Sequence, residues 1–299
     1  MRSIALIGAP SSAGAYAPGQ EKAPEALRRA GLVDRLSAAG FACRDFGDVE
    51  GFRWRADPAS PLAMNVAQVA AVASAVAAQV RRARSANLLP LVVGGDCTIE
   101  LGTLAGSFAP SHRTGLIYFD LDADLNTPET TPDGALDWMG VAHMLGLPGA
   151  VDRLTKIGPR RPMLVPEDLL LFGAGNITAP EQAVIDQRAI EIIDVAAVGA
   201  DPASAAARAV AWAGSFDQVL IHFDVDVIDY ENFPLAENVR RKCGITVDAA
   251  MTALTILLSA DNLAGLTVCE VNPDHGAEGG ATIVDFANRL AGSFGGAGA

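Results

Sequence analysis

The feature that most constrains the fold of this 299-residue chain is the alternation of apolar strand-like runs with helical segments. Leu88–Val93, Thr114–Asp120 and Gln218–Asp224 are rich in Val, Ile and Leu, and helical patterns such as Asn65–Ala86 separate runs of this kind. Near-continuous apolar strands that alternate with helices are typical of a parallel sheet covered on both faces. No linker-like stretch divides the chain. We therefore predict an α/β fold in a single domain of residues 1–299.

Two of these runs end in closely spaced aspartates. Asp120, Asp122 and Asp124 alternate along one segment, and Asp224 and Asp226 repeat the spacing about a hundred residues later. Side chains at i, i+2 and i+4 of a strand share one face. Like charges this close raise one another's pKa or require a counter-cation. The pattern therefore predicts a site for a pair of divalent metal ions.

Polar clusters follow four strand-like runs: GGDC, DLDADLN, DVDVID and EVNPDH. In open α/β sheets, ligands bind outside the carboxyl ends of the strands. One aspartate pair after a strand is often only a helix cap or a turn. Four such clusters at one edge predict a shared functional site.

The composition limits the classes of partner and the location. A formal net charge of −13 disfavours nucleic acid and anionic membranes, and it suits cationic ligands or simply solubility. Four dispersed cysteines without a CxxC motif do not form a disulfide framework, so we expect a cytoplasmic protein. The apolar run Ile4–Ile7 is too short for the roughly 7–15 residues of a signal-peptide core. The stretch Val66–Val80 falls short of the roughly 20 apolar residues of a membrane span.

The order of the four clusters resembles the arginase/agmatinase (ureohydrolase) superfamily, whose motifs read GGDH, DAHxD, DxDxxDP and EVNP. Here the counterparts are Gly94–Cys97, Asp120–Asp124, Asp224–Asp229 and Glu270–Pro273. The resemblance implies a three-layer α/β/α fold with an eight-stranded parallel sheet. It also implies two manganese ions bridged by a hydroxide that attacks a guanidinium carbon, and a homo-oligomer, either a trimer or a hexamer.

The resemblance also assigns roles to individual residues. Glu270 would hold a small cationic guanidino-type substrate, and Asn126 would contact a substrate carboxylate. Asp120 and Asp224 would bridge both ions, and Asp124 would be both a ligand and a catalytic residue. The implied metal ligands are Cys97, Asp120, Asp122, Asp124, Asp224 and Asp226.

Both histidine ligands of the family are replaced, by Cys97 and Asp122. Five carboxylates lower the Lewis acidity of a bound metal, so we expect an alkaline pH optimum, weaker activation per metal ion or a protonated Asp122. Thiolate is a soft ligand and manganese prefers oxygen or imidazole. Cys97 could therefore favour zinc or a single occupied site, or it could be a small buried hydrophobic residue.

Three further residues carry open alternatives. The family's mobile histidine is absent, and His143 could replace it as a general acid or could pack on a helix face. His222 could support a metal ligand or lie in the core. Asp133 would repel a substrate carboxylate, which favours a substrate that is neutral or cationic at that end, or it could only start the turn before Gly134.

Two functions follow from these observations. The first is a metal-dependent hydrolase of a guanidino or amidino C–N bond that releases urea or an analogue. The second is a catalytically degenerate relative that acts as a binding or structural partner, because both histidine ligands and the mobile histidine are lost. The retained and extended aspartate set favours the enzyme.

Overall fold

The structure, a computed structural model, describes residues 3–296 and is organised around one eight-stranded sheet in which every strand pair is parallel. The strand order is β2-β1-β3-β8-β7-β4-β5-β6. The strands are β1 Ile4–Gly8, β2 Cys43–Asp48, β3 Leu89–Val93, β4 Thr114–Phe119, β5 Leu169–Phe172, β6 Glu191–Ile193, β7 Gln218–Asp224 and β8 Leu263–Cys269. The predicted eight-stranded parallel sheet is confirmed.

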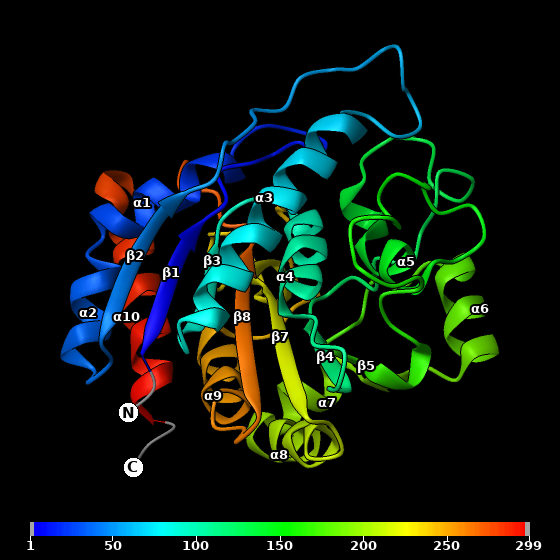
Figure 1. The fold of residues 1–299 in the computed structure, drawn as a ribbon. Helices are drawn as coiled ribbons and strands as arrows, with labels where there is room; N and C mark the ends of the chain where they lie inside the picture. Colours follow the sequence, from blue (N-terminus) through cyan, green and yellow to red (C-terminus); the bar gives the residue numbers. More distant parts are fainter. Residues whose placement is uncertain (1–2, 297–299) are drawn as a thin grey trace.

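Helices cover both faces of this sheet and give three layers (Figure 1). One apolar core packs α1, α2, α8, α9 and α10 against the sheet, and two further clusters pack α3, α4 and α5 against the other face. The helices are α1 Ala23–Arg29, α2 Leu32–Ala38, α3 Val66–Ser85, α4 Glu100–Ser107, α5 Gly140–Leu145, α6 Ala179–Arg188, α7 Val195–Ala200, α8 Pro202–Ala213, α9 Val247–Leu257 and α10 Ala281–Gly295.

The central strands are buried on both faces, which explains their near-continuous apolar runs. Phe119 and Phe223 belong to the core beneath α8 and α9, whereas Leu116 and Leu220 belong to the core beneath α3 and α4. Every residue of β4 and β7 is buried. No helix within residues 3–296 combines the length and the apolar character needed to cross a membrane.

The sequence prediction differs from the structure in two helical regions. The sequence predicts one helix over residues 23–39, but these residues form two helices, because Gly31 adopts a left-handed conformation with φ +78° between α1 and α2. The short helix α7 was not predicted. Asp194 starts it by accepting a hydrogen bond from the Ala197 N–H at 2.7 Å, and six residues carry too little periodicity to be recognised.

The register of the central strands aligns their carboxyl ends. Phe119 of β4 pairs with Phe223 of β7, and Val268 of β8 pairs with both Phe223 and Val93 of β3. The loops that follow these four strands therefore leave the sheet at the same level. This alignment brings the four polar clusters of the sequence to one edge of the sheet.

Candidate functional site

Three aspartates from two separate strand ends meet at this edge. Asp120, Asp224 and Asp226 each offer a carboxylate oxygen, and these oxygens lie within 4.8 Å of one another. Asp120 accepts a hydrogen bond from the Asp122 N–H and Asp224 accepts one from the Asp226 N–H, both at 2.7 Å. In each case the backbone after the strand binds the Oδ1 atom of the aspartate, and the Oδ2 atom faces the interior of the cluster.

Burial and mutual repulsion make these carboxylates costly to ionise without a counter-charge. Burial raises the pKa of Asp120 and of Asp224 well above the usual range, and the charge of Asp226 raises both further. The Asp226 Oδ1 atom is buried and has no hydrogen-bond partner among the described residues. An unpartnered carboxylate oxygen in such a cluster fits a divalent cation, because hard cations bind oxygen donors.

One arginine, which the sequence analysis did not single out, lies over part of this cluster. Arg240 donates a hydrogen bond to Asp122, and its Nη1 lies 3.6 Å from Asp226 Oδ2. Its guanidinium also lies over the Trp138 ring, 5.5 Å from the centroid. The five aspartates predicted as metal ligands and the one guanidinium together carry a formal charge of −4. Arg240 begins the basic run Arg240–Lys242, but nothing in this run indicates which carboxylates Arg240 contacts.

Asp122 is the carboxylate that takes the place of a family histidine. Burial and the charge of Asp226 raise its pKa, and Arg240 and Asn176 partly offset this, to give a value of about 7. Asn176 donates a hydrogen bond to its other oxygen. The sequence predicts an alkaline pH optimum, weaker activation per metal ion or a protonated Asp122. The pKa of about 7 agrees with the third of these, an Asp122 that retains its proton near neutral pH.

A cavity of about 140 Å³ opens beside these residues. Asp122, Asp124 and Asp133 line it together with Asn126 and Trp138, and the other lining residues are Thr131, Asn176, Thr178, Glu181 and Arg240. The predicted substrate-binding residues Asn126 and Asp133 are therefore at the cavity. Asp133 also accepts hydrogen bonds from the Ala135 N–H and from Trp138 Nε1, both at 3.0 Å, so it starts the turn before Gly134 as well.

Asp124 and Glu270 occupy unusual backbone positions. Asp124 has φ +50° and its Oδ2 accepts a hydrogen bond of 2.5 Å from the Tyr118 hydroxyl. Glu270 has φ +62°, and its Oε2 accepts a hydrogen bond of 2.9 Å from Gln20 Nε2. Glu270 Oε1 is buried without a hydrogen-bond partner among residues 3–296. Left-handed non-glycine residues are often found at functional sites, where surrounding contacts hold them in place.

Cys97 lies among the carboxylates rather than only in apolar surroundings. Its Sγ is 2.8 Å from Asp224 Oδ2 and 3.9 Å from Asp120 Oδ2. Its backbone N–H donates to Asp137 at 2.9 Å, and Asp137 is a buried carboxylate to which the sequence analysis gave no role. The position agrees with Cys97 being a ligand or a neighbour of ligands.

His143 is not brought to the cavity. It lies in α5, is 1 % exposed and is not among the residues that line the cavity. Burial lowers its pKa to about 4, with only partial compensation from the Met139 backbone. Because a general acid must carry a proton and reach the substrate, the predicted role of His143 has no support in the geometry.

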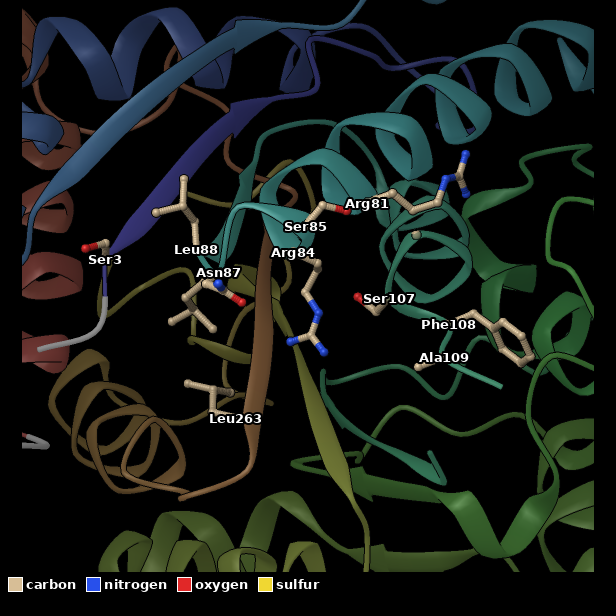
Figure 2. Close-up of a pocket in the computed structure, with 12 residues that line it drawn as sticks. Ser3, Arg81, Arg84, Ser85, Asn87, Leu88, Ser107, Phe108, Ala109 and Leu263 are labelled. Carbon is tan, nitrogen blue, oxygen red and sulfur yellow. The ribbon is translucent and has the colours of Figure 1, made fainter. Parts of the chain in front are cut away.

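Another pocket lies at the opposite edge of the sheet. It has a volume of about 760 Å³ and borders the beginnings of β1, β3 and β8 at Ser3, Leu89 and Leu263. Arg84 and Ser107 face it from the ends of α3 and α4 (Figure 2). Among the described residues that line this pocket there is no carboxylate, and none of them lines the acidic cavity.

The fold and the site together define a class: a three-layer α/β/α protein with an eight-stranded parallel sheet and an acidic centre at the carboxyl ends of its strands. Residues 2–294 match the family described as the arginase family. The arginase of Bacillus subtilis is 28 % identical over 294 residues, covering 97 % of this chain and 98 % of that protein. Human arginase-1 is 25 % identical and covers 92 % of this chain and 86 % of its own length.

Solved structures agree with the sequence matches. The crystal structure of Bacillus subtilis arginase superposes with a TM-score of 0.86 at 26 % identity and covers 98 % of both chains. Formimidoylglutamase from the same species superposes with a TM-score of 0.74 at 18 % identity over 99 % of this chain and 87 % of that one, which shows a shared fold. The chain belongs to the arginase family, and the predicted family resemblance is confirmed.

Proposed function

We propose that this protein is a divalent-metal-dependent hydrolase that cleaves a C–N bond of a guanidino or amidino compound and releases urea or an analogue. The observation that carries the proposal is the buried oxygen cluster of Asp120, Asp224 and Asp226 beside an acidic cavity, in a chain of the arginase family. The relatives named arginase support the reaction class.

The residues present fit an oxygen-bound divalent ion, with manganese as the preferred candidate. Asp120, Asp224 and Asp226 would hold it, and the unpartnered oxygen of Asp226 supports this assignment. Asp124, which groups with Asp120 and Cys97, is the further ligand that the family resemblance implies. What such an ion supplies when bound is an activated nucleophile near neutral pH and stabilisation of developing charge. The contact of Arg240 with both Asp122 and Asp226 favours one ion at this centre over two.

The cavity supports a small cationic substrate. Carboxylates of Asp122, Asp124 and Asp133 line it, and they would attract a guanidinium or amidinium group and repel a substrate carboxylate. The family resemblance assigns the guanidinium to Glu270. A volume of about 140 Å³ is below the roughly 300–1,000 Å³ of drug-sized pockets, so the substrate would be compact.

One side chain of this site would transfer a proton, and another would orient a metal ligand. Asp122 lines the cavity, and in the metal-free chain burial and the charge of Asp226 raise its pKa to about 7, so it is the carboxyl group proposed to deliver a proton to a departing amine. Tyr118 holds Asp124 in a fixed orientation through its 2.5 Å hydrogen bond. Asp122 would thus take over part of the function that the absent histidine serves in relatives.

A second candidate function is ligand binding without hydrolysis. It is favoured by one observation, the guanidinium of Arg240 paired with Asp122 and facing Asp226. An internal guanidinium at this position would compete with both a second ion and a guanidino substrate.

The two candidates are separated by a urea-release assay. The purified protein is treated with chelator, reloaded with Mn²⁺ or Zn²⁺, and assayed with neutral and cationic guanidino compounds and with L-arginine. We expect metal-dependent turnover of at least one neutral or cationic compound. Asp124→Asn should abolish it, and Asp186→Asn, which changes an exposed carboxylate on α6, should not. Ligand binding without turnover under any metal would favour the second candidate.

A further inference from the structure

A second group of potential metal ligands includes His222, which lies two residues before Asp224 on β7 and so farther inside the sheet than the oxygen cluster. Cys97, His222, Asp224 and Cys269 each offer one ligand atom, and these four atoms lie within 4.8 Å of one another. All four side chains are at most 3 % exposed. The family motifs include Cys97 and Asp224 but neither His222 nor Cys269, and the metal proposal above used neither of the latter.

Strand register explains why these residues meet. Asp224 of β7 pairs with Cys269 of β8, and paired residues of parallel strands point to the same face. His222 lies two residues before Asp224, so it shares that face. Cys97 reaches them from the turn that follows β3, the strand on the other side of β8.

The distances approach those of a tetrahedral thiolate–imidazole site. Zinc bonds of about 2.3 Å to sulfur and about 2.0 Å to nitrogen place two sulfurs about 3.8 Å apart, and a sulfur and a nitrogen about 3.5 Å apart. The Sγ atoms of Cys97 and Cys269 are 3.6 Å apart, and Cys269 Sγ is 3.4 Å from His222 Nε2. The Cys97–Asp224 contact, at 2.8 Å, is shorter than such a site requires and has to open to admit an ion.

A buried carboxylate, that of Glu100, faces the Nδ1 side of the His222 ring. Glu100 Oε2 lies 3.5 Å from His222 Nδ1, and Glu100 is 0 % exposed. Neither Glu100 oxygen makes a hydrogen bond in the described part of the chain. Histidines that bind metal through Nε2 commonly direct their Nδ1–H to a carboxylate, which fixes the tautomer. Glu100 on Nδ1 therefore favours Nε2 as the ligand atom of His222, and Nε2 also lies 3.6 Å from Asp120 Oδ2 of the oxygen cluster.

We propose that Cys97, Cys269, His222 Nε2 and Asp224 form a closed site for a thiophilic divalent cation, with zinc as its closest match. Two thiolates and an imidazole select such ions over manganese. Four protein ligands without solvent exposure describe a structural ion rather than a catalytic one. The ion would fix Asp224, whose neighbours Asp120 and Asp226 complete the oxygen cluster above it. The proposal does not depend on hydrolysis of any substrate.

The site is tested on the full chain produced in zinc- or cobalt-supplemented medium. We expect about one tightly held zinc ion per chain, and X-ray absorption of that zinc should show two sulfur neighbours at about 2.3 Å. The cobalt form should show a thiolate-to-cobalt charge-transfer band. Cys269→Ser should weaken this band and lower the bound metal, whereas Cys43→Ser, a thiol of β2, should change neither.

Two results would overturn the site. One is a tightly bound metal with only oxygen and nitrogen neighbours, and the other is a protein that retains no zinc or cobalt. The absorption measurement needs only the unaltered chain, so it decides the matter even if Cys269→Ser fails to fold. A chain with the sulfur-bound ion and no urea release would keep this site and reject the proposed hydrolase. A chain that hydrolyses a guanidino compound without sulfur-bound metal would support the proposed hydrolase and reject this site.

Discussion

At the scale of single residues, the site differs from the family motif by compensating changes. Asp122 replaces a neutral imidazole with a carboxylate, and Arg240 supplies a positive charge directly against it. The aspartates were evident from the sequence because their spacing fixes a shared strand face. Arg240 was not, because no local pattern links a loop residue to a carboxylate on another strand.

The first prediction concerns Arg240→Ala. Removal of the guanidinium leaves Asp122 and Asp226 without their cation, so metal-free protein should lose stability. The loss should be smaller than the roughly 3–5 kcal/mol of a fully buried pair, because the Arg240 side chain is 29 % exposed. The same change should increase the number or affinity of bound divalent ions. Chemical denaturation and metal analysis measure the two effects.

Arg241→Ala is the matched control, since the Arg241 guanidinium lies over the Tyr230 ring rather than over the carboxylates. If Arg240→Ala and Arg241→Ala behave alike in both measurements, Arg240 does not neutralise the acidic centre.

At the scale of elements, the strand ends and the tight turns after them place the ligands. The sequence located these strands well because apolar runs of Val, Ile and Leu are long and are bounded by glycine or acidic residues. It gave no information on the neighbour relations that bring β8 between β3 and β7. For this reason Cys269 and Glu100 were missed: each is unremarkable in its own segment and gains significance only beside His222.

The second prediction concerns the turn that presents Cys97. Gly95 has φ +86°, and a Cβ atom there would lie 2.8 Å from the Ala9 carbonyl oxygen and 2.9 Å from Ile99 Cγ2. Gly95→Ala should therefore destabilise the protein by about 1–3 kcal/mol through backbone strain, with a further steric cost, and should displace Cys97. Thermal denaturation and metal content measure these effects.

Gly40→Ala provides the comparison, because Gly40 has φ +93° and no atom within 4 Å of the added Cβ. Gly40→Ala should lower the stability only by the backbone strain, without the steric cost, and should leave the metal content unchanged. Equal destabilisation by the two variants would contradict a crowded turn at Gly95.

At the scale of the whole molecule, the three-layer fold was predictable because its signals are repeated along the chain. The charge balance of the buried centre could not be predicted from the sequence, because it depends on which side chains become neighbours in the fold. Asp120, Asp124 and Asp224 all have pKa values raised by burial, and Asp122 has a pKa of about 7. The stability of the molecule should therefore depend on pH and on bound cations together.

The third prediction is the sign of that dependence. The unfolded chain releases the Asp122 proton near a pKa of about 3.9, whereas the folded, metal-free chain retains it until about 7. The folded state binds more protons in this window, so the free energy of unfolding should fall as pH rises from about 4 to about 7. Bound Mn²⁺ should restore more stability at the higher pH.

Thermal denaturation of chelated and Mn²⁺-loaded protein across this range measures the effect, and Asp122→Asn should reduce the slope. A wild type whose metal-free stability has the same pH slope as that of Asp122→Asn would show that Asp122 ionises normally.

The central claim is that carboxylates at the ends of two strands that are distant in sequence but adjacent in the sheet hold a divalent cation. The most direct measurement is the binding of Mn²⁺ to the metal-free protein, followed by the electron paramagnetic resonance signal of the free ion. We predict binding of at least one ion per chain. Asp226→Asn should weaken it at least tenfold, and Asp186→Asn should leave it unchanged. If the free-ion signal shows no Mn²⁺ binding to the wild type, or the same binding to Asp226→Asn, the acidic edge of the sheet is not a metal centre.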